Sequence, residues 1–167
     1  YQAVILRARK ADALSNITNV RTALTAYQTD YSGWPLALVA LRINGTDARI
    51  DAGTNFAAPG QWRDVFYTLT AQGDTDLFAT NNKRRIVSID FSPKQINDKA
   101  NPTNSTTFPD PWGREFNIVI DSNGDNRLDD LPNLAATTGN IGINGSMAIW
   151  SFGPEPTRRK DYVASWK

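Results

Sequence analysis

The first 31 residues constrain the fold most, because they favour one long helix with a single apolar face. Its apolar and aromatic residues recur at steps of three and four: Leu14, Ile17, Val20, Leu24, Tyr27 and Tyr31. The opposite face is polar and carries Arg7, Lys10, Asn16, Asn19, Arg21 and Gln28. At ~1.5 Å per residue such a helix runs ~45 Å, longer than a compact domain of this size, so we expect part of it to project. The alternative is a core helix with a frayed start.

The two ends of this helix carry different signals. Residues 32–35, Ser-Gly-Trp-Pro, end it, because Gly suits a helix C-terminus and Pro follows where a helix cannot continue. No capping residue precedes it, and the only methionine is Met147, so we expect further residues upstream of Tyr1. The apolar residues 4–6 are far fewer than the ~20 needed to cross a bilayer.

The rest of the chain predicts a second, short helix followed by strands. Residues 61–72 have helical spacing of apolar side chains, and Gly73 ends them. Short β-branched or aromatic runs predict strands at 85–91, 115–121, 146–152 and 161–166. Residues 36–59 favour a loop with at most a short helix and a hairpin-like turn, and residues 97–110 favour an exposed loop. Helices first and strands later predict an α+β fold with an antiparallel sheet in one domain, residues 1–167.

Composition excludes several classes of function. The chain of 167 residues has no Cys and no His, which removes disulfides, thiolate nucleophiles, the usual zinc sites and imidazole acid–base chemistry. Its formal net charge is +1, so charge favours no nucleic-acid partner. Paired-carboxylate catalysis needs a buried acid in a cleft, which no pattern here indicates. We therefore expect a protein that is not an enzyme.

A run of acidic residues at alternate positions predicts a calcium site, which we call the aspartate loop (residues 121–129). Its candidate ligands are Asp121, Asn123, Asp125 and Asp129 through side chains and Arg127 through its carbonyl. The loop resembles the first nine positions of an EF-hand or dockerin-type calcium loop.

The aspartate loop departs from that pattern at two positions. Asn126 replaces the usual Gly, although Asn tolerates a left-handed backbone. Pro132 stands where a bidentate Glu is expected, and Asp130 is a candidate substitute. The alternative is a solvated hairpin loop built on Asn123-Gly124.

Three features together resemble the type IV pilin-like superfamily, and within it the major pseudopilin of type II secretion systems. The first is the helix ending, with Asn19, Ala23, Leu24, Tyr27, Asp30 and the Gly-Trp-Pro of residues 33–35. The second is Asp-Pro-Trp-Gly at residues 110–113, which we call the DPWG turn. The third is the ending IWSFGPEPTRRKDYVASW, residues 149–166, similar to a family ending of strand, turn and final strand.

The resemblance implies a pilin-like fold, with a spine helix at residues 1–31 and a globular head at residues 36–167. It also implies an upstream apolar half of the helix, preceded by a prepilin leader, that anchors the subunit in the inner membrane and later packs inside a filament. The implied partners are other pilin-like subunits, with Leu14, Ile17, Val20 and Leu24 packing the head on the spine and residues 4–6 continuing into the filament core. The implied location is the bacterial cell envelope, with a periplasmic head or an extracellular filament.

Major pseudopilins of the resembled family bind calcium near the C-terminal turn, with carboxylates just before the final strand. Here that stretch has three cations at residues 158–160, and only Glu155 and Asp161 are acidic. We therefore expect calcium at the aspartate loop instead.

Two functions remain open. The first is a structural subunit of a pseudopilus or pilus that supports protein secretion and is stabilised by calcium. The second is a calcium-dependent cell-surface adhesin or glycan-binding module, in which exposed Trp34, Trp62 and Trp112 contact the ligand.

Overall fold

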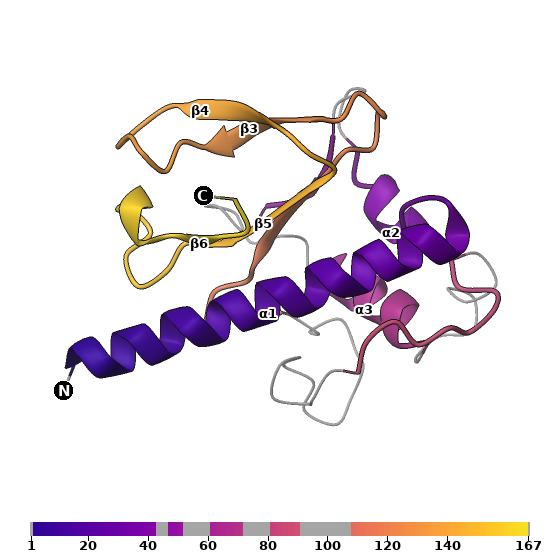
Figure 1. Ribbon diagram of the computed structural model, residues 1–167, viewed down its shortest axis with the longest axis horizontal. Helices are drawn as coiled ribbons and strands as arrows, with labels where there is room; N and C mark the ends of the chain where they lie inside the picture. Colours follow the sequence, from indigo (N-terminus) through magenta and orange to yellow (C-terminus); the bar gives the residue numbers. More distant parts are fainter. Residues whose placement is uncertain (1, 43–46, 52–60, 72–80, 91–107, 167) are drawn as a thin grey trace.

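The computed structural model describes residues 2–42, 47–51, 61–71, 81–90 and 108–166. Within these residues the chain is α+β, with a long N-terminal helix, α1 (Gln2–Tyr31), and a small antiparallel sheet, as the sequence predicted (Figure 1). The other elements are α2 (Leu36–Val39), β1 (Ala48–Ile50), α3 (Gln61–Thr70), β2 (Asn117–Ile120), β3 (Arg127–Pro132), β4 (Asn140–Asn144), β5 (Met147–Ser151), the 3-10 helix η1 (Arg159–Asp161) and β6 (Val163–Ala164).

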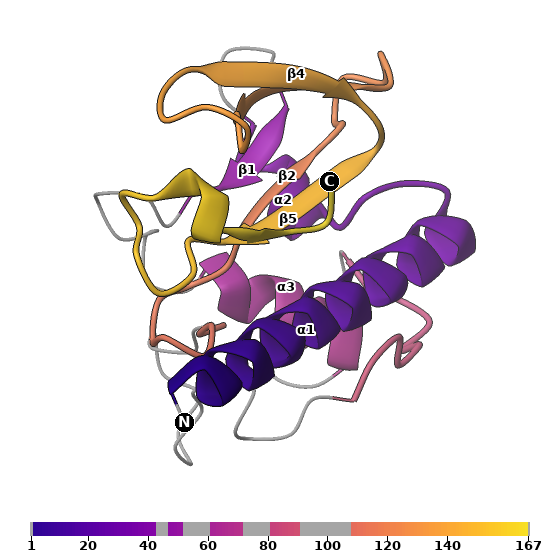
Figure 2. The same cartoon turned by 60° about the vertical axis from the view of Figure 1, so that its left-hand side comes forward.

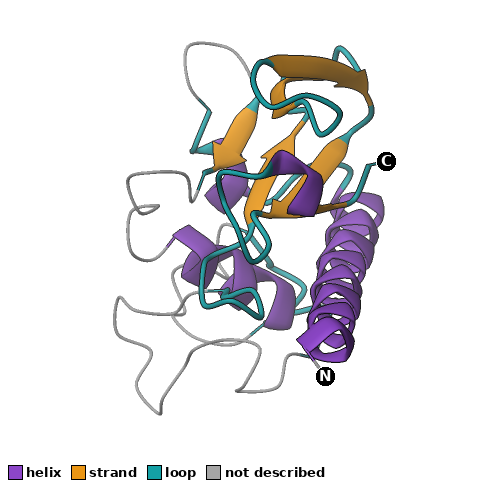
Figure 3. Ribbon diagram, turned by 90° about the vertical axis from the view of Figure 1, so that its left-hand side faces the viewer, coloured by secondary structure: helices purple, strands orange, loops and turns teal. Residues whose placement is uncertain are grey.

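The main sheet separates the helices from a β-hairpin. Its strand order is β1-β2-β5-β6, all antiparallel, and α1 packs on β5 and β6. The hairpin of β3 and β4 covers the other face (Figures 2 and 3). Side chains along β2 alternate between the two faces of the main sheet. Ile118 and Ile120 face the helices, whereas Val119 packs with the hairpin residues Leu128 and Leu131. The main sheet is therefore buried on both faces.

The apolar face of α1 covers only part of its length. Burial begins at Ala13 and continues along one face through Asn16, Ile17, Val20, Ala23, Leu24 and Tyr27. Leu14, expected in this face, is 48% exposed, and Asn16, expected opposite, is buried. The buried face is therefore centred on Ala13 and Ile17 and leaves Leu14 at its edge. In Figure 1 the N-terminal tip of the helix reaches past the head, whereas Lys10 still pairs with Asp161 of η1 at 3.5 Å.

The end of α1 differs in one detail from the prediction. Ser32, not Gly33, takes the left-handed backbone after the helix, with φ 54°. Trp34 then donates its indole Nε1–H to the carbonyl oxygen of Asp121 at 2.7 Å. The helix ending is thereby joined to the start of the aspartate loop.

Helix α3 follows its predicted bounds closely and contributes to an aromatic cluster. Trp62 and Phe66 stack at 5.5 Å between ring centroids, and both meet the buried Phe108 edge-on at 5.2 Å. Phe108 also packs on Phe116 at 4.5 Å. Phe108 and Asp110 were expected in an exposed loop and are buried instead, whereas residues 97–107 of that loop lie outside the described residues.

The strand predicted at residues 85–91 is wrong for residues 85–90, which form no strand, and Phe91 lies outside the described residues. The Asn82 side chain forms hydrogen bonds with the backbone here: it accepts from Ile86 N at 2.9 Å and donates to Thr68 O in α3 at 2.7 Å. Ser88 N donates at 2.8 Å to the carbonyl oxygen of Leu69, which lies in the last turn of α3. The segment is therefore held against α3, not against a strand.

Three strands were missed. Strand β1 lies in the predicted loop of residues 36–59, where only α2 was anticipated as a short helix. Strands β3 and β4 form the hairpin, with an irregular register between Leu128 and Leu131. The predicted strands 115–121 and 146–152 hold β2 and β5, and 161–166 holds only the two residues of β6 after η1.

Candidate metal centre

The first half of the aspartate loop forms a tight connection between β2 and β3. Two left-handed positions give it its path: Gly124 with φ 82° and Asn126 with φ 57°. Asn126 therefore adopts the backbone usually given to Gly, as the sequence predicted. The loop is fixed to the start of β5, because Asp121 N donates to Ser146 O at 2.9 Å and Gly145 N donates to Asn126 O at 3.0 Å.

Side chains of the loop fold inward onto its own backbone. Both carboxylate oxygens of Asp121 accept, from Gly124 N at 2.7 Å and from Asn126 N at 2.8 Å. Asn123 Oδ1 accepts from Asp125 N at 3.0 Å, and Asp125 Oδ1 accepts from Arg127 N at 2.9 Å. Asn123 also donates to Asp125 Oδ2 at 3.0 Å. The structure thus brings together three of the five predicted ligands, Asp121, Asn123 and Asp125.

The other two predicted ligands pair with each other on the hairpin. Arg127 Nε donates to Asp129 Oδ1 at 2.7 Å, and this bond with Asp129 raises the pKa of Arg127. Both side chains lie over Gly142 of β4, where an added Cβ would come within 2.6 Å of each. Asp130, the candidate substitute, lines the cavity between the sheets instead. Among the described residues no three acidic side chains lie close enough together to hold a metal ion as they stand.

Sequence reasoning missed an acidic residue beside this loop, Asp47. Ala48 pairs with Ile120 at the end of the β1–β2 ladder, so Asp47 and Asp121 are the residues next to this last pair. Ala48 N also donates to Ser122 Oγ at 3.1 Å, which ties the two segments together. A lone Asp in a predicted loop gives no signal of this kind, because only strand pairing brings it to Asp121.

Burial and like charge both act on Asp47, which is 7% exposed. Its pKa is raised, chiefly by burial and then by the negative charges of Asp121 and Asp125, whereas backbone N–H groups of Asp129 and Ser122 lower it. Asp129 N donates to Asp47 Oδ2 at 3.3 Å. Within the described part of the chain, the other oxygen, Oδ1, is shut off from solvent and has no hydrogen-bond partner.

The C-terminal acids do not form an alternative centre. Glu155 is exposed and accepts from Thr157 Oγ1 at 3.0 Å. Asp161 lies in η1 and is paired with Lys10 of α1 at 3.5 Å and with Arg158 at 3.4 Å. The carboxylate of Asp161 is therefore already paired with two basic side chains.

The DPWG turn is a closed structural unit. Asp110 Oδ1 accepts from Trp112 N and Arg114 N, each at 2.9 Å, and Oδ2 accepts from Ser151 Oγ at 2.6 Å. Gly113 takes φ 83°. Arg114 Nη1 donates to Gly153 O at 2.8 Å, which connects the turn to the end of β5.

The three tryptophans expected to be exposed are buried or partly buried. Trp62 is 1% exposed and donates to Phe116 O at 2.9 Å. Trp34 and Trp112 are partly buried and pack against the core. A different cavity, of about 360 Å³, lies between the main sheet and the hairpin and is lined by Arg49, Asp51, Asp130, Pro132, Asn140, Trp150, Phe152, Arg159 and Tyr162.

In the described residues no helix combines the length and hydropathy needed to cross a membrane. Comparison with known proteins gives no assignment: no family model, curated protein or solved structure matches this chain.

Proposed function

We propose that this chain is a structural, non-enzymatic subunit of a pilus-like filament in the bacterial cell envelope, similar to the major pseudopilins of type II secretion, and that it supports protein secretion. The fold supports the proposal in outline, because a long N-terminal helix packs its C-terminal part on an antiparallel sheet. The pilin-like assignment itself rests on the helix ending, the DPWG turn and the C-terminal stretch. We further propose that the aspartate loop binds calcium and stabilises the head.

The single observation that carries the filament proposal is the exposed apolar patch of Val4 and Ile5 in the first third of α1. Val4 is 68% exposed and Ile5 is 42% exposed, and no residue of the segment 2–12 is buried. A helix is stabilised mainly by covering its apolar side, so an apolar patch without cover indicates a contact surface. We propose that the first third of α1 packs against α1 helices of neighbouring subunits. No nucleic acid is part of this proposal, because the net charge is only +1.

Filament assembly by the full gene product in its own bacterium tests this surface. Val4→Glu combined with Ile5→Glu should abolish filaments seen by electron microscopy, because charges cannot be buried between helices without large cost. The matched control is Ala26→Glu, at an exposed position in the part of α1 beside the head. The purified heads of both variants should melt within about 2 °C of wild type, because exposed substitutions change stability little. Normal filaments from the double variant would contradict the proposal.

The gene itself offers a second, independent test. A short basic leader followed by an apolar segment beginning like Gly-Phe-Thr-Leu-Ile-Glu would support the pilin-like subunit and its inner-membrane anchor. A cleaved secretory signal alone would rule that subunit out.

The cavity between the sheets favours a second candidate, a calcium-dependent adhesin or glycan-binding module. Trp150, Phe152 and Tyr162 contribute to its lining beside the cations Arg49 and Arg159. Trp150 and Tyr162 are buried, so a sugar would contact the half-buried Phe152 and the two guanidinium groups, which are hydrogen-bond donors. Binding of oligosaccharides to the purified head, followed by NMR and lost in Arg159→Ala, would favour this candidate over the filament. Absence of binding across acidic and neutral glycans would remove it.

A further inference from the structure

The most unusual group near the aspartate loop is the carboxylate of Asp47. Its Oδ1 atom is buried and has no hydrogen-bond partner among the described residues. Its Oδ2 atom accepts a long bond from Asp129 N at 3.3 Å, and the backbone N–H of Ser122 also favours the carboxylate. Buried polar atoms almost always have a partner, and a buried anion without one is strongly disfavoured. The site is therefore short of positive charge.

The neighbouring charges increase this deficit. Asp47 and Asp121 adjoin the last pair of the β1–β2 ladder, and the negative charges of Asp121 and Asp125 both act on Asp47. The nearest arginines along these strands are engaged elsewhere: Arg49 pairs with Asp51 at 3.8 Å and Arg127 with Asp129 at 2.7 Å. A cation between Asp47 and the loop would offset both the burial and the repulsion.

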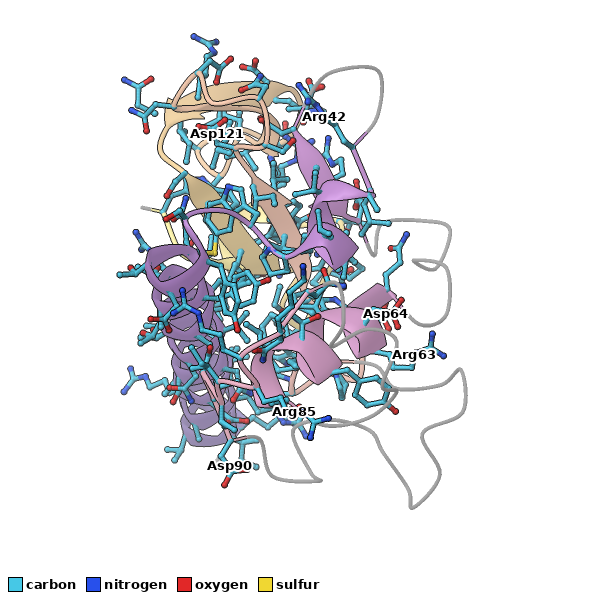
Figure 4. All side chains as sticks on the ribbon, turned by 90° about the vertical axis from the view of Figure 1, so that its right-hand side faces the viewer. Arg42, Arg63, Asp64, Arg85, Asp90 and Asp121 are labelled. Carbon is cyan, nitrogen blue, oxygen red and sulfur yellow. The ribbon has the colours of Figure 1, made fainter. Side chains whose placement is uncertain are left out.

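The aspartate loop needs one more carboxylate for calcium. Pro132 occupies the position of the strong bidentate ligand, and Asp129 is taken by Arg127. Figure 4 shows Asp121 beside the hairpin, at the same end of the molecule as Arg42, whose backbone bridges Ala48. An acid in the segment leading into β1 can therefore reach the loop from outside it.

We infer that Asp47 is the carboxylate that completes the aspartate loop, and that calcium binds between Asp47, Asp121 and Asp125. The inference rests on the calcium part of the proposed function and names the ligand that the loop lacks. Asp125 is exposed and Asp121 is half-buried, and both carboxylates now accept from backbone N–H groups of the loop, so binding would exchange some of these hydrogen bonds for coordination of the ion. Calcium accepts such irregular oxygen sets.

The ion would couple three parts of the fold. Asp47 precedes β1, the loop leads into β3 of the hairpin, and Asp121 is held by Trp34 at the end of α1. Arg49 Nη2 already donates to Asp130 O at 3.5 Å, a weak contact between β1 and the same hairpin. Calcium would therefore hold the hairpin onto the main sheet.

Titration of the purified head with calcium chloride by calorimetry, together with melting in calcium or in EDTA, tests the inference. The variants are Asp47→Asn and Asp125→Ala, with Asp51→Asn as the control from the same segment. Wild type and Asp51→Asn should bind one calcium per chain, whereas both site variants should bind at least about 10-fold more weakly. In EDTA, Asp47→Asn should melt at or above wild type, because it removes a buried, repelled charge.

The possible outcomes separate the claims. Wild-type affinity in Asp47→Asn would overturn the role of Asp47 and leave calcium binding at the loop intact. No binding by wild type at millimolar calcium would overturn both, without touching the filament proposal. If Asp47→Asn does not fold, Asp47→Ser replaces it. In addition, terbium bound to wild type should emit when Trp34 is excited, and absence of this sensitised emission would count against the site.

Discussion

Two aspartate turns at opposite ends of β2 differ in how the carboxylates there are satisfied. At the DPWG turn, Asp110 is 4% exposed, and both of its oxygens accept short hydrogen bonds, two from backbone N–H groups and one from Ser151. At the aspartate loop, Asp47 is almost as buried, at 7%, but one oxygen has no partner among the described residues. The two carboxylates are therefore similarly buried, but within the described part of the chain only that of Asp110 has hydrogen-bond donors to both oxygens.

The difference separates a structural acid from a candidate ligand. The charge of Asp110 is compensated by three donors that the fold supplies. Asp47 has a raised pKa and faces other carboxylates, so the fold leaves room for a cation. An aspartate-rich sequence alone does not distinguish these two situations.

The largest expected effect is the loss of the Asp110 carboxylate. Asp110→Ala should lower the free energy of unfolding by about 4 kcal/mol, because hydrogen bonds to a buried charge are each worth about 1.5–3 kcal/mol and their donors would be stranded. Urea denaturation measures the change. Asp90→Ala, at an exposed position, is the control and should stay within about 0.5 kcal/mol of wild type. A loss below about 1 kcal/mol would show that the turn does not depend on this anion.

Calcium should distinguish the two turns next. At free calcium about 100-fold above its dissociation constant, wild type should gain about 2.7 kcal/mol of unfolding free energy, and Asp125→Ala should gain almost none. Asp110→Ala should show the same calcium increment as wild type, because its turn is not part of the site. The measurement is urea denaturation in calcium and in EDTA. An equal increment in Asp125→Ala would remove the ion from the aspartate loop.

Two glycines provide a matched pair with a smaller effect. Gly113 in the DPWG turn and Gly124 in the aspartate loop have φ of 83° and 82°, and an added Cβ meets nothing within 4 Å at either. Alanine at either position should therefore cost about 1 kcal/mol in EDTA, from backbone strain alone. In calcium, only Gly124→Ala should lose more, because distortion of the loop also weakens binding. Equal losses in both media would indicate that the loop binds no ion.

Much of the fold follows from local patterns in the sequence. The period of three and four residues gives α1 and α3, and the β-branched runs give β2 and β5. The strand prediction for residues 85–90 is wrong because Asn82 and Leu69 form hydrogen bonds with backbone groups of this segment. Strand propensity does not include such contacts. Strand β4 had a usable signal, since Ile141 and Ile143 alternate with polar or small residues and pack toward the hairpin core.

The candidate site was predictable only in part. Alternate acids and amides indicated Asp121, Asn123 and Asp125, which do share one tight loop. The same spacing continued into Asp129, but there the backbone becomes a strand and places Asp129 beside Arg127. Asp47 lies 74 residues before Asp121 and reaches it only through the register of β1 on β2, which no local pattern encodes.

The smallest predicted effect concerns Glu115, which closes the DPWG turn through a bridge to Pro109. Burial raises the pKa of Glu115. The folded protein therefore keeps the Glu115 proton to higher pH than the unfolded chain does. As pH rises from the usual carboxyl range of about 4 toward 7, the unfolded chain ionises first, and this group lowers the free energy of unfolding.

Glu115→Gln should abolish that contribution. The stability of wild type relative to the variant should therefore fall between pH 4 and about pH 7, and it should level off once the folded carboxyl has ionised. Urea denaturation of both proteins across this range isolates the effect, because all other carboxylates are common to the pair. A difference that does not change with pH would mean that burial leaves the Glu115 charge well solvated, and the contrast with Asp110 would then rest on hydrogen bonding alone.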